Sequence, residues 1–189
     1  MIMNLNLNAF FREYGTFERD VRCFSDDLFN RICSSCITPC CKAEICYESI
    51  ESPFLSSLRK IFPPLVSFSE TNGWLTESGC VLQAGRPPVC HEFLCNTIMD
   101  ELPTSLHKSV IMVLSQLMTH IGKNALGRRH LVEIMSEDRL QKMNLSRIRN
   151  RLTDARLSFK EIQGFFSGCR LNSKSFIQFK KIRPILTGS

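Results

Sequence analysis

The chain has 189 residues, 43% of them apolar, and a formal net charge of +6. This length and apolar content are enough to bury a hydrophobic core, and ten cysteines are too few for a disulfide-stapled miniprotein. No apolar run is long enough to span a bilayer, so we expect one soluble domain over residues 1–189 that makes no membrane contact.

The first predicted element is a long amphipathic helix that ends at Cys33. Its apolar residues recur at spacings of three and four, with charged residues between them. They are Phe10, Tyr14, Phe17, Val21, Phe24, Leu28 and Ile32. We expect this face to be buried, and we expect Cys23, beside it, to be a small buried apolar residue.

The start of the chain shows neither a basic region nor an apolar segment followed by a small-residue cleavage site. We therefore expect no secretory signal and a reducing, cytoplasmic location. In that compartment, a dense group of cysteines indicates a metal site or a redox centre rather than a disulfide framework.

The next helix is predicted from about Glu51 to Phe62, with Ser52 as its cap and Pro53 in its first turn. Pro63 and Pro64 would end it. The following stretch is interrupted by glycine and proline up to about residue 95. It is predicted to form short strands or turns folded around metal.

Helical periodicity returns beyond Pro103, and the segment 103–165 is predicted to be the helical part of the same core. One helix would end at Gly122, and further helix is expected across 130–160. The tail from Cys169 fits a short strand or an irregular packed segment equally well. The fold class is therefore mainly α: amphipathic helices packed around an irregular, metal-stapled cysteine-rich segment with at most short strands.

Eight of the ten cysteines fall into two tight clusters within residues 33–95. A C-x-x-C step allows two thiolates to reach one ion, and a second distant segment can complete a tetrahedral or cluster site. Two of the cysteines are adjacent, which suits two neighbouring metals, a cluster edge, or one ligand beside one inert thiol. The candidate metal ligands are Cys33, Cys36, Cys40, Cys41, Cys46, Cys80, Cys90 and Cys95.

This pattern resembles the zinc- or iron-chelating cysteine-cluster family, often called YkgJ-like, to which the bacterial flagellin lysine methylases are related. Two motif blocks carry the resemblance. The first is Cys33, Cys36, Cys40 and Cys41, and the second is Cys80, Leu82, Arg86, Pro87, Cys90, Phe93 and Cys95. The resemblance implies a thiolate site for zinc or iron, either as a bound ion or as an iron–sulfur cluster, with Arg86 offsetting its negative charge.

The chain also departs from the family pattern. A cysteine expected near Asn72 is missing, and Cys46 is the candidate replacement. Gln83 stands in place of a tyrosine, and His91 in place of an arginine. His91 could be a nitrogen ligand, an outer-shell hydrogen-bond donor, or an exposed residue without a role.

Three functions remain open at this point. The first is a cytoplasmic metal-binding protein with a structural, metal-handling or redox role and a possible protein partner. The second is an enzyme that uses the cluster, redox or protein methyltransferase-like, although no strand leads into a glycine-rich G-x-G loop. The third is a metal-stapled nucleic-acid binder that uses the Arg-rich helix at 139–156, with Arg147, Arg149 and Arg151. Acidic residues interspersed in this basic half of the chain, such as Glu137 and Asp154, favour a solvated helix face instead.

Overall fold

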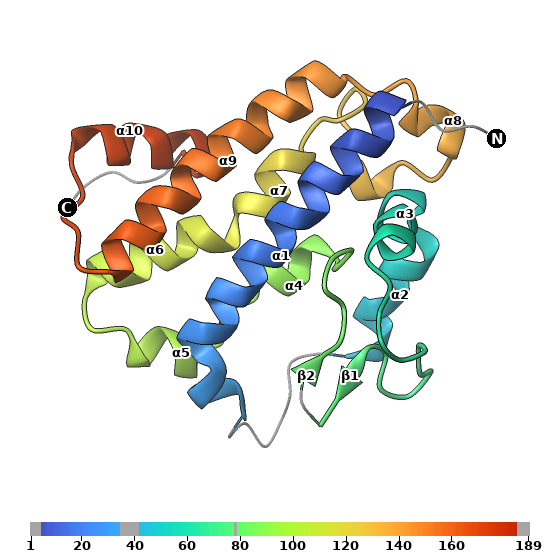
Figure 1. The fold of residues 1–189 in the computed structure, drawn as a ribbon. Coiled ribbons are helices and arrows are strands. Elements are labelled where there is room, and N and C mark those ends of the chain that lie inside the picture. Colours follow the sequence, from blue (N-terminus) through green and yellow to red (C-terminus); the bar gives the residue numbers. More distant parts are fainter. Residues whose placement is uncertain (1–4, 35–41, 78, 185–189) are drawn as a thin grey trace.

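The computed structural model describes residues 5–34, 42–77 and 79–184. Two long helices, α1 (Leu5–Ser34) and α9 (Leu145–Phe166), lie side by side across the molecule (Figure 1). Behind them, α7 (Leu117–Gly122) packs on α9, and α10 (Ser173–Ile182) packs on the same helix. These helices form the larger part of the hydrophobic core.

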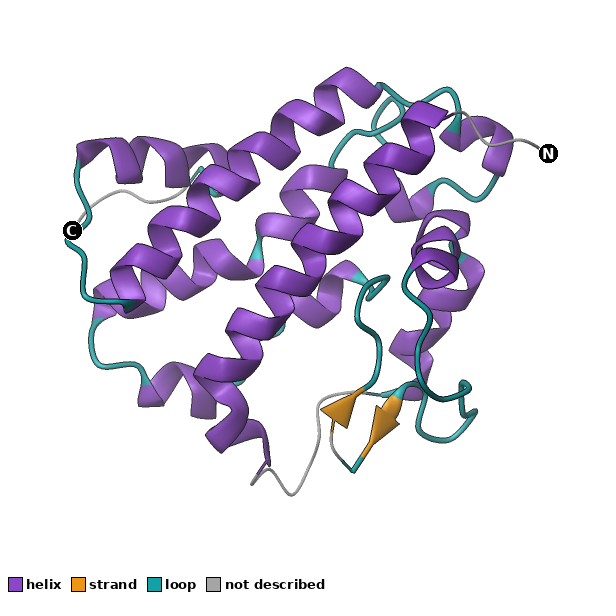
Figure 2. Ribbon diagram, viewed as in Figure 1, coloured by secondary structure: helices purple, strands orange, loops and turns teal. Residues whose placement is uncertain are grey.

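The cysteine-rich half of the chain forms shorter elements beside α1 (Figure 2). Their bounds are α2 (Ala43–Glu51), α3 (Pro53–Ile61), β1 (Leu75–Thr76), β2 (Gly79–Cys80), α4 (Pro88–Glu92) and α5 (Asn96–Glu101). The two strands pair in antiparallel fashion, with Leu75 opposite Cys80. The expectation of a mainly α fold with short strands is therefore confirmed for the described residues.

The remaining elements link α5 to α9. They are α6 (Ser105–Ser115), the 3₁₀ turn η1 (Leu131–Glu133) and α8 (Glu137–Leu140). The helix expected to end at Gly122 is divided at Gln116 into α6 and α7. In the segment 130–160, where further helix was expected, the long helix α9 begins at Leu145, and only η1 and α8 precede it.

The aromatic face of α1 explains how the two halves are joined. Phe10, Phe11 and Tyr14 are completely or almost completely buried, and all three surround Phe54 of α3. Their ring centroids lie 6.5, 5.4 and 4.9 Å from that of Phe54. Offset and edge-on ring contacts at these separations add to the free energy gained by burying aromatic surface.

The predicted start and end of α3 are confirmed. Ser52 caps the helix by accepting a hydrogen bond from the Leu55 N–H, and Pro53 occupies the first turn. The Phe62 ring then packs on Gly15 of α1 so closely that a side chain at residue 15 would overlap it. The position of α3 against α1 is thus set by contacts at both of its ends.

Two predictions about these elements are wrong. The tail forms α10 rather than a strand or an irregular segment, because Asn172 caps the helix and Phe179 and Ile182 are buried three residues apart. Cys23 is exposed on α1, because Phe24 rather than Cys23 faces α9.

Acid is expected to destabilise the fold through His120, on α7. Burial and then the nearby Arg151 guanidinium lower the pKa of His120 to about 4. In the unfolded chain that pKa is about 6.5, so between these values only the unfolded chain binds the proton. The stability present above pH 6.5 is therefore lost as the pH falls towards 4, by about 1–2 kcal/mol after allowance for solvent screening.

Urea unfolding at a series of pH values measures this effect. His120→Gln cannot titrate, so its free energy of unfolding should fall less than that of the wild type between pH 6.5 and 4. Parallel curves for the two proteins would show that His120 does not contribute.

Candidate metal centre

Two of the predicted ligands, Cys46 and Cys80, belong to one small apolar cluster outside the main core. Cys46 comes from α2 and Cys80 from β2. In this Cys46 cluster, Cys46, Trp74 and Leu82 are buried, and Phe68, Cys80 and Val81 pack against them. The fold thus brings together thiols from the two cysteine-bearing segments of the sequence.

The environment of Cys46 favours a neutral thiol when no metal is bound. Burial raises the pKa of Cys46, and the neighbouring Cys80 raises it further. The pKa of Cys46 is lowered by a hydrogen bond from the Trp74 backbone and, separately, by the charge of the Arg86 guanidinium. A bound cation would favour the thiolate form of Cys46 instead, because a metal-ligating cysteine gives up its proton.

Hydrogen bonds fix the backbone around Cys46. The Ser49 hydroxyl donates to the Cys46 carbonyl at 2.6 Å and accepts from Trp74 Nε1 at 2.8 Å. The Arg59 guanidinium lies over the Trp74 ring, 5.3 Å from its centroid, and its Nε donates to the Ser49 carbonyl at 3.0 Å. The thiol of Cys46 is therefore held by α2, α3 and the strand that follows Gly73.

Gly73 has a specific reason to be glycine. Its φ of +60° lies in the left-handed region, and a Cβ at this position would lie 2.6 Å from Cys46 Sγ. Any side chain would be strained and would also displace the thiol.

Two guanidinium groups converge on Cys80. Arg86 Nη2 and Arg22 Nη2 each donate to the Cys80 carbonyl at 3.3 Å. Arg86 Nε also donates to the Leu82 carbonyl at 3.2 Å. Both contacts with Cys80 are to its backbone carbonyl, and Arg22 Nε also pairs with Asp26 at 3.0 Å. Guanidinium groups in this position would offset the charge of a thiolate-rich centre.

The arginine at residue 86 is positioned by a buried carboxylate on α1. Glu18 is fully buried and accepts hydrogen bonds from the backbone N–H groups of Gly85 and Arg86, both at 2.8 Å. His91 Nε2 lies 3.2 Å from Glu18 Oε1, with the His91 side chain only 7% exposed. Of the alternatives for His91, the exposed residue without a role is wrong.

Glu18 and Arg22 were not predicted from the sequence. A signal was nevertheless present, because Glu18 lies four residues after Tyr14 and three before Val21, on the apolar face of the helix. A carboxylate at such a position needs buried partners.

The other predicted ligands are less fully placed. Cys33 is exposed in the last turn of α1, Cys90 is exposed in α4, and Cys95 directly precedes α5 and packs partly against the main core. Cys36, Cys40 and Cys41 lie outside the described residues. Within the residues that the structure describes, no three His, Cys, Asp or Glu side chains are close enough to hold one ion.

Three described elements that carry or border predicted ligands lie near one another. The C-terminal end of α1, the start of α2 and the β1–β2 hairpin lie at the same end of the molecule (Figure 1). The end of α1 and the start of α2 therefore lie at the end of the molecule that holds the Cys46 cluster.

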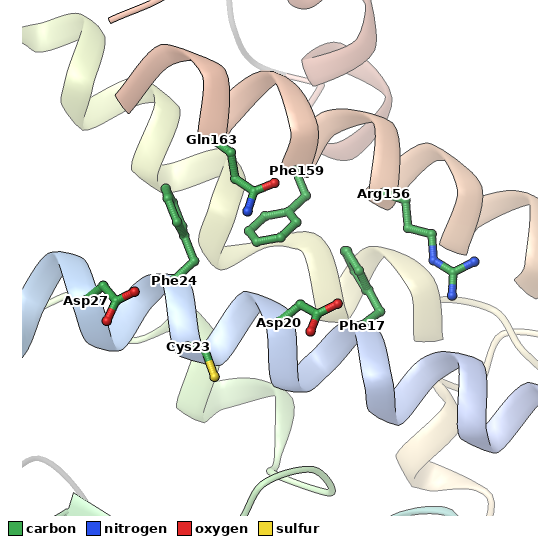
Figure 3. A pocket seen from close by; sticks show the side chains of 8 residues that line it. All are labelled: Phe17, Asp20, Cys23, Phe24, Asp27, Arg156, Phe159 and Gln163. Carbon is green, nitrogen blue, oxygen red and sulfur yellow. The ribbon is translucent and has the colours of Figure 1, made fainter. Parts of the chain in front are cut away.

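A separate groove of about 460 Å³ lies between α1 and α9 (Figure 3). It is lined by Phe17, Asp20, Cys23, Phe24, Asp27, Arg156, Phe159 and Gln163. By helical spacing, its acidic residues face away from Glu18 and Arg22. This groove is therefore distinct from the Cys46 cluster.

Two arginines of α9, Arg149 and Arg156, contact α1. Arg149 Nη2 lies 3.2 Å from Glu13 Oε1 and donates to the Asn6 carbonyl, while Arg156 donates to the Glu13 carbonyl. These contacts join α9 to α1.

Over the described ranges 5–34, 42–77 and 79–184, no helix combines the length and apolar character needed to cross a bilayer. Comparisons of the chain with protein-family models, with curated protein sequences and with solved structures gave no match.

Proposed function

We propose that this protein binds zinc or iron through a cysteine-thiolate centre, as the resemblance to the YkgJ-like family implies, and that the centre has a structural, metal-handling or redox role. The observation that carries the proposal is the meeting of Cys46 and Cys80 in one apolar cluster beside Arg22 and Arg86. A buried thiol and a half-buried thiol flanked by guanidinium groups suit a negatively charged thiolate–metal centre.

The chemistry of the donor set fits such a metal. Soft thiolates favour zinc, or iron in an iron–sulfur cluster, over magnesium and calcium. Cys46 and Cys80 would supply two thiolates, and the remaining ligands would come from Cys33, Cys36, Cys40, Cys41, Cys90 and Cys95. Bound metal would supply the cross-link that joins the segment before α2 to the hairpin.

Neighbouring residues would support such a centre. Trp74 and Leu82 pack with Cys46 in the buried part of the cluster, and the low exposure would strengthen the attraction between its thiolate and a cation. Arg22 and Arg86 would limit the repulsion between neighbouring thiolates. The His91 Nε2 contact with Glu18 makes His91 a supporting residue rather than a ligand through that nitrogen.

Metal content after purification without oxygen tests the proposal. We expect a stoichiometric amount of zinc or iron in the wild type, and we expect Cys46→Ser and Cys80→Ser to lose most of it. Cys23→Ser and Cys169→Ser are the matched controls, because both thiols are exposed and lie outside the predicted ligand set. Visible absorption would indicate an iron–sulfur cluster, and a colourless zinc protein would indicate a zinc site.

Wild-type protein that holds no metal under reducing conditions would contradict the proposal. Unchanged metal content in both Cys46→Ser and Cys80→Ser would remove these two residues from the site.

A further inference from the structure

We infer that Glu18 is a positioning residue of the metal centre, which acts through the Arg-Pro turn formed by Gly85, Arg86, Pro87 and Pro88. The inference rests on the proposed function, and it adds a residue that lies outside both cysteine motifs. Glu18 is on α1, and three of its hydrogen-bonding partners lie between β2 and the end of α4.

Glu18 needs buried hydrogen-bond partners, and the fold provides them. A fully buried carboxylate is costly unless hydrogen bonds replace its water. Here Oε2 accepts from the Gly85 N–H and Oε1 from the Arg86 N–H, and His91 Nε2 contacts Oε1. Both oxygens are engaged by protein groups, so Glu18 is placed to orient the turn rather than to bind the metal.

The backbone of the turn is shaped to receive this carboxylate. Gly85 has a φ of +85°, which a residue with a side chain rarely adopts. A Cβ at this position would also lie 3.0 Å from the Leu55 carbonyl oxygen. Consecutive amides of such a turn can point at one anion, which is the arrangement that Glu18 uses.

The turn orients Arg86 on one side and α4, with His91, on the other. On one side, Arg86 is held by its backbone N–H and reaches back to the carbonyls of Cys80 and Leu82. On the other side, His91 is adjacent to Cys90 within α4. Because proline restricts φ, Pro87 and Pro88 transmit the orientation from Arg86 to α4.

These contacts predict that a change at Glu18 weakens metal binding by misplacing the turn that carries Arg86. Glu18→Gln keeps the size of the side chain but replaces one acceptor oxygen with an N–H donor, which would face a backbone N–H. Changes to groups that orient metal ligands typically weaken metal binding by about 10–100-fold. We expect a loss of this size even though Glu18 does not contact the metal.

The experiment is an anaerobic titration of metal-free full-length protein with Co²⁺, which reports thiolate ligation by its absorption. We expect Glu18→Gln to bind Co²⁺ about 10–100-fold more weakly and with an altered thiolate-to-metal band. Glu13→Gln is the matched control, because Glu13 is also a glutamate of α1 but pairs with Arg149, away from the cysteines. It should bind Co²⁺ like the wild type.

Several outcomes separate the two proposals. Wild-type Co²⁺ affinity and an unchanged band in a folded Glu18→Gln protein would overturn the role of Glu18 while leaving the metal centre in place. Absence of Co²⁺ binding by the wild type would overturn the proposed function itself. If Glu18→Gln does not fold, Glu18→Asp decides the matter: a several-fold weaker affinity supports the inference, and wild-type affinity overturns it.

Discussion

Removal of the metal with a chelator is expected to loosen the cysteine-bearing half of the protein selectively. Structural zinc sites contribute apparent free energies of about 10–16 kcal/mol at neutral pH. The Cys46 cluster buries only Cys46, Trp74 and Leu82 among the described residues, so it has little apolar contact to replace the metal. The main core around α1, α7 and α9 has extensive apolar packing of its own.

Amide hydrogen exchange before and after chelation measures this difference. We expect exchange to accelerate most in α2 and in residues 73–95, and to change least in α7 and α9. Returning zinc or iron should restore protection, which controls for direct effects of the chelator. A uniform increase across the chain, or no change in α2, would contradict a local stapling role.

Phe54→Ala is expected to destabilise the folded protein by about 3–5 kcal/mol. Phe54 is completely buried and lies at the centre of the contact between α3 and the aromatic face of α1. Truncation would leave a cavity that Phe10, Phe11 and Tyr14 cannot close without moving α3. Because α2 and α3 pack together, the change would also disturb the position of Cys46.

Urea denaturation of the wild type and the variant gives the difference in the free energy of unfolding. Phe176→Ala is the matched control, since Phe176 is 39% exposed on α10. Its truncation should lower the free energy of unfolding by less than about 1.5 kcal/mol. A similar small cost for Phe54→Ala would show that this ring does not hold α3 on α1.

The sequence predicted the structure best where a local pattern, such as apolar spacing or a helix cap, agreed with the way the element packs in the fold. The apolar spacing of α1 and the Ser52–Pro53 start of α3 predicted both helices. Cys46 and Cys80 were among the predicted ligands, and the fold places them in one cluster.

Prediction failed where tertiary contacts or capping decided the outcome. The tail shows only loose alternation, yet Asn172 begins a helix there and Ser175 hydrogen-bonds to Glu161 of α9. Glu18 was missed because helical periodicity treats a charged residue as part of the polar face. Its buried partners come from residues 85–91, far along the chain, and local patterns carry no information about such contacts.

The most direct measurement is X-ray absorption at the metal edge of wild-type protein purified under reducing conditions. We expect sulfur to dominate the atoms bound to the metal, at about 2.3 Å for zinc. Stoichiometric metal surrounded by oxygen and nitrogen alone, or protein with no bound metal, would contradict this expectation.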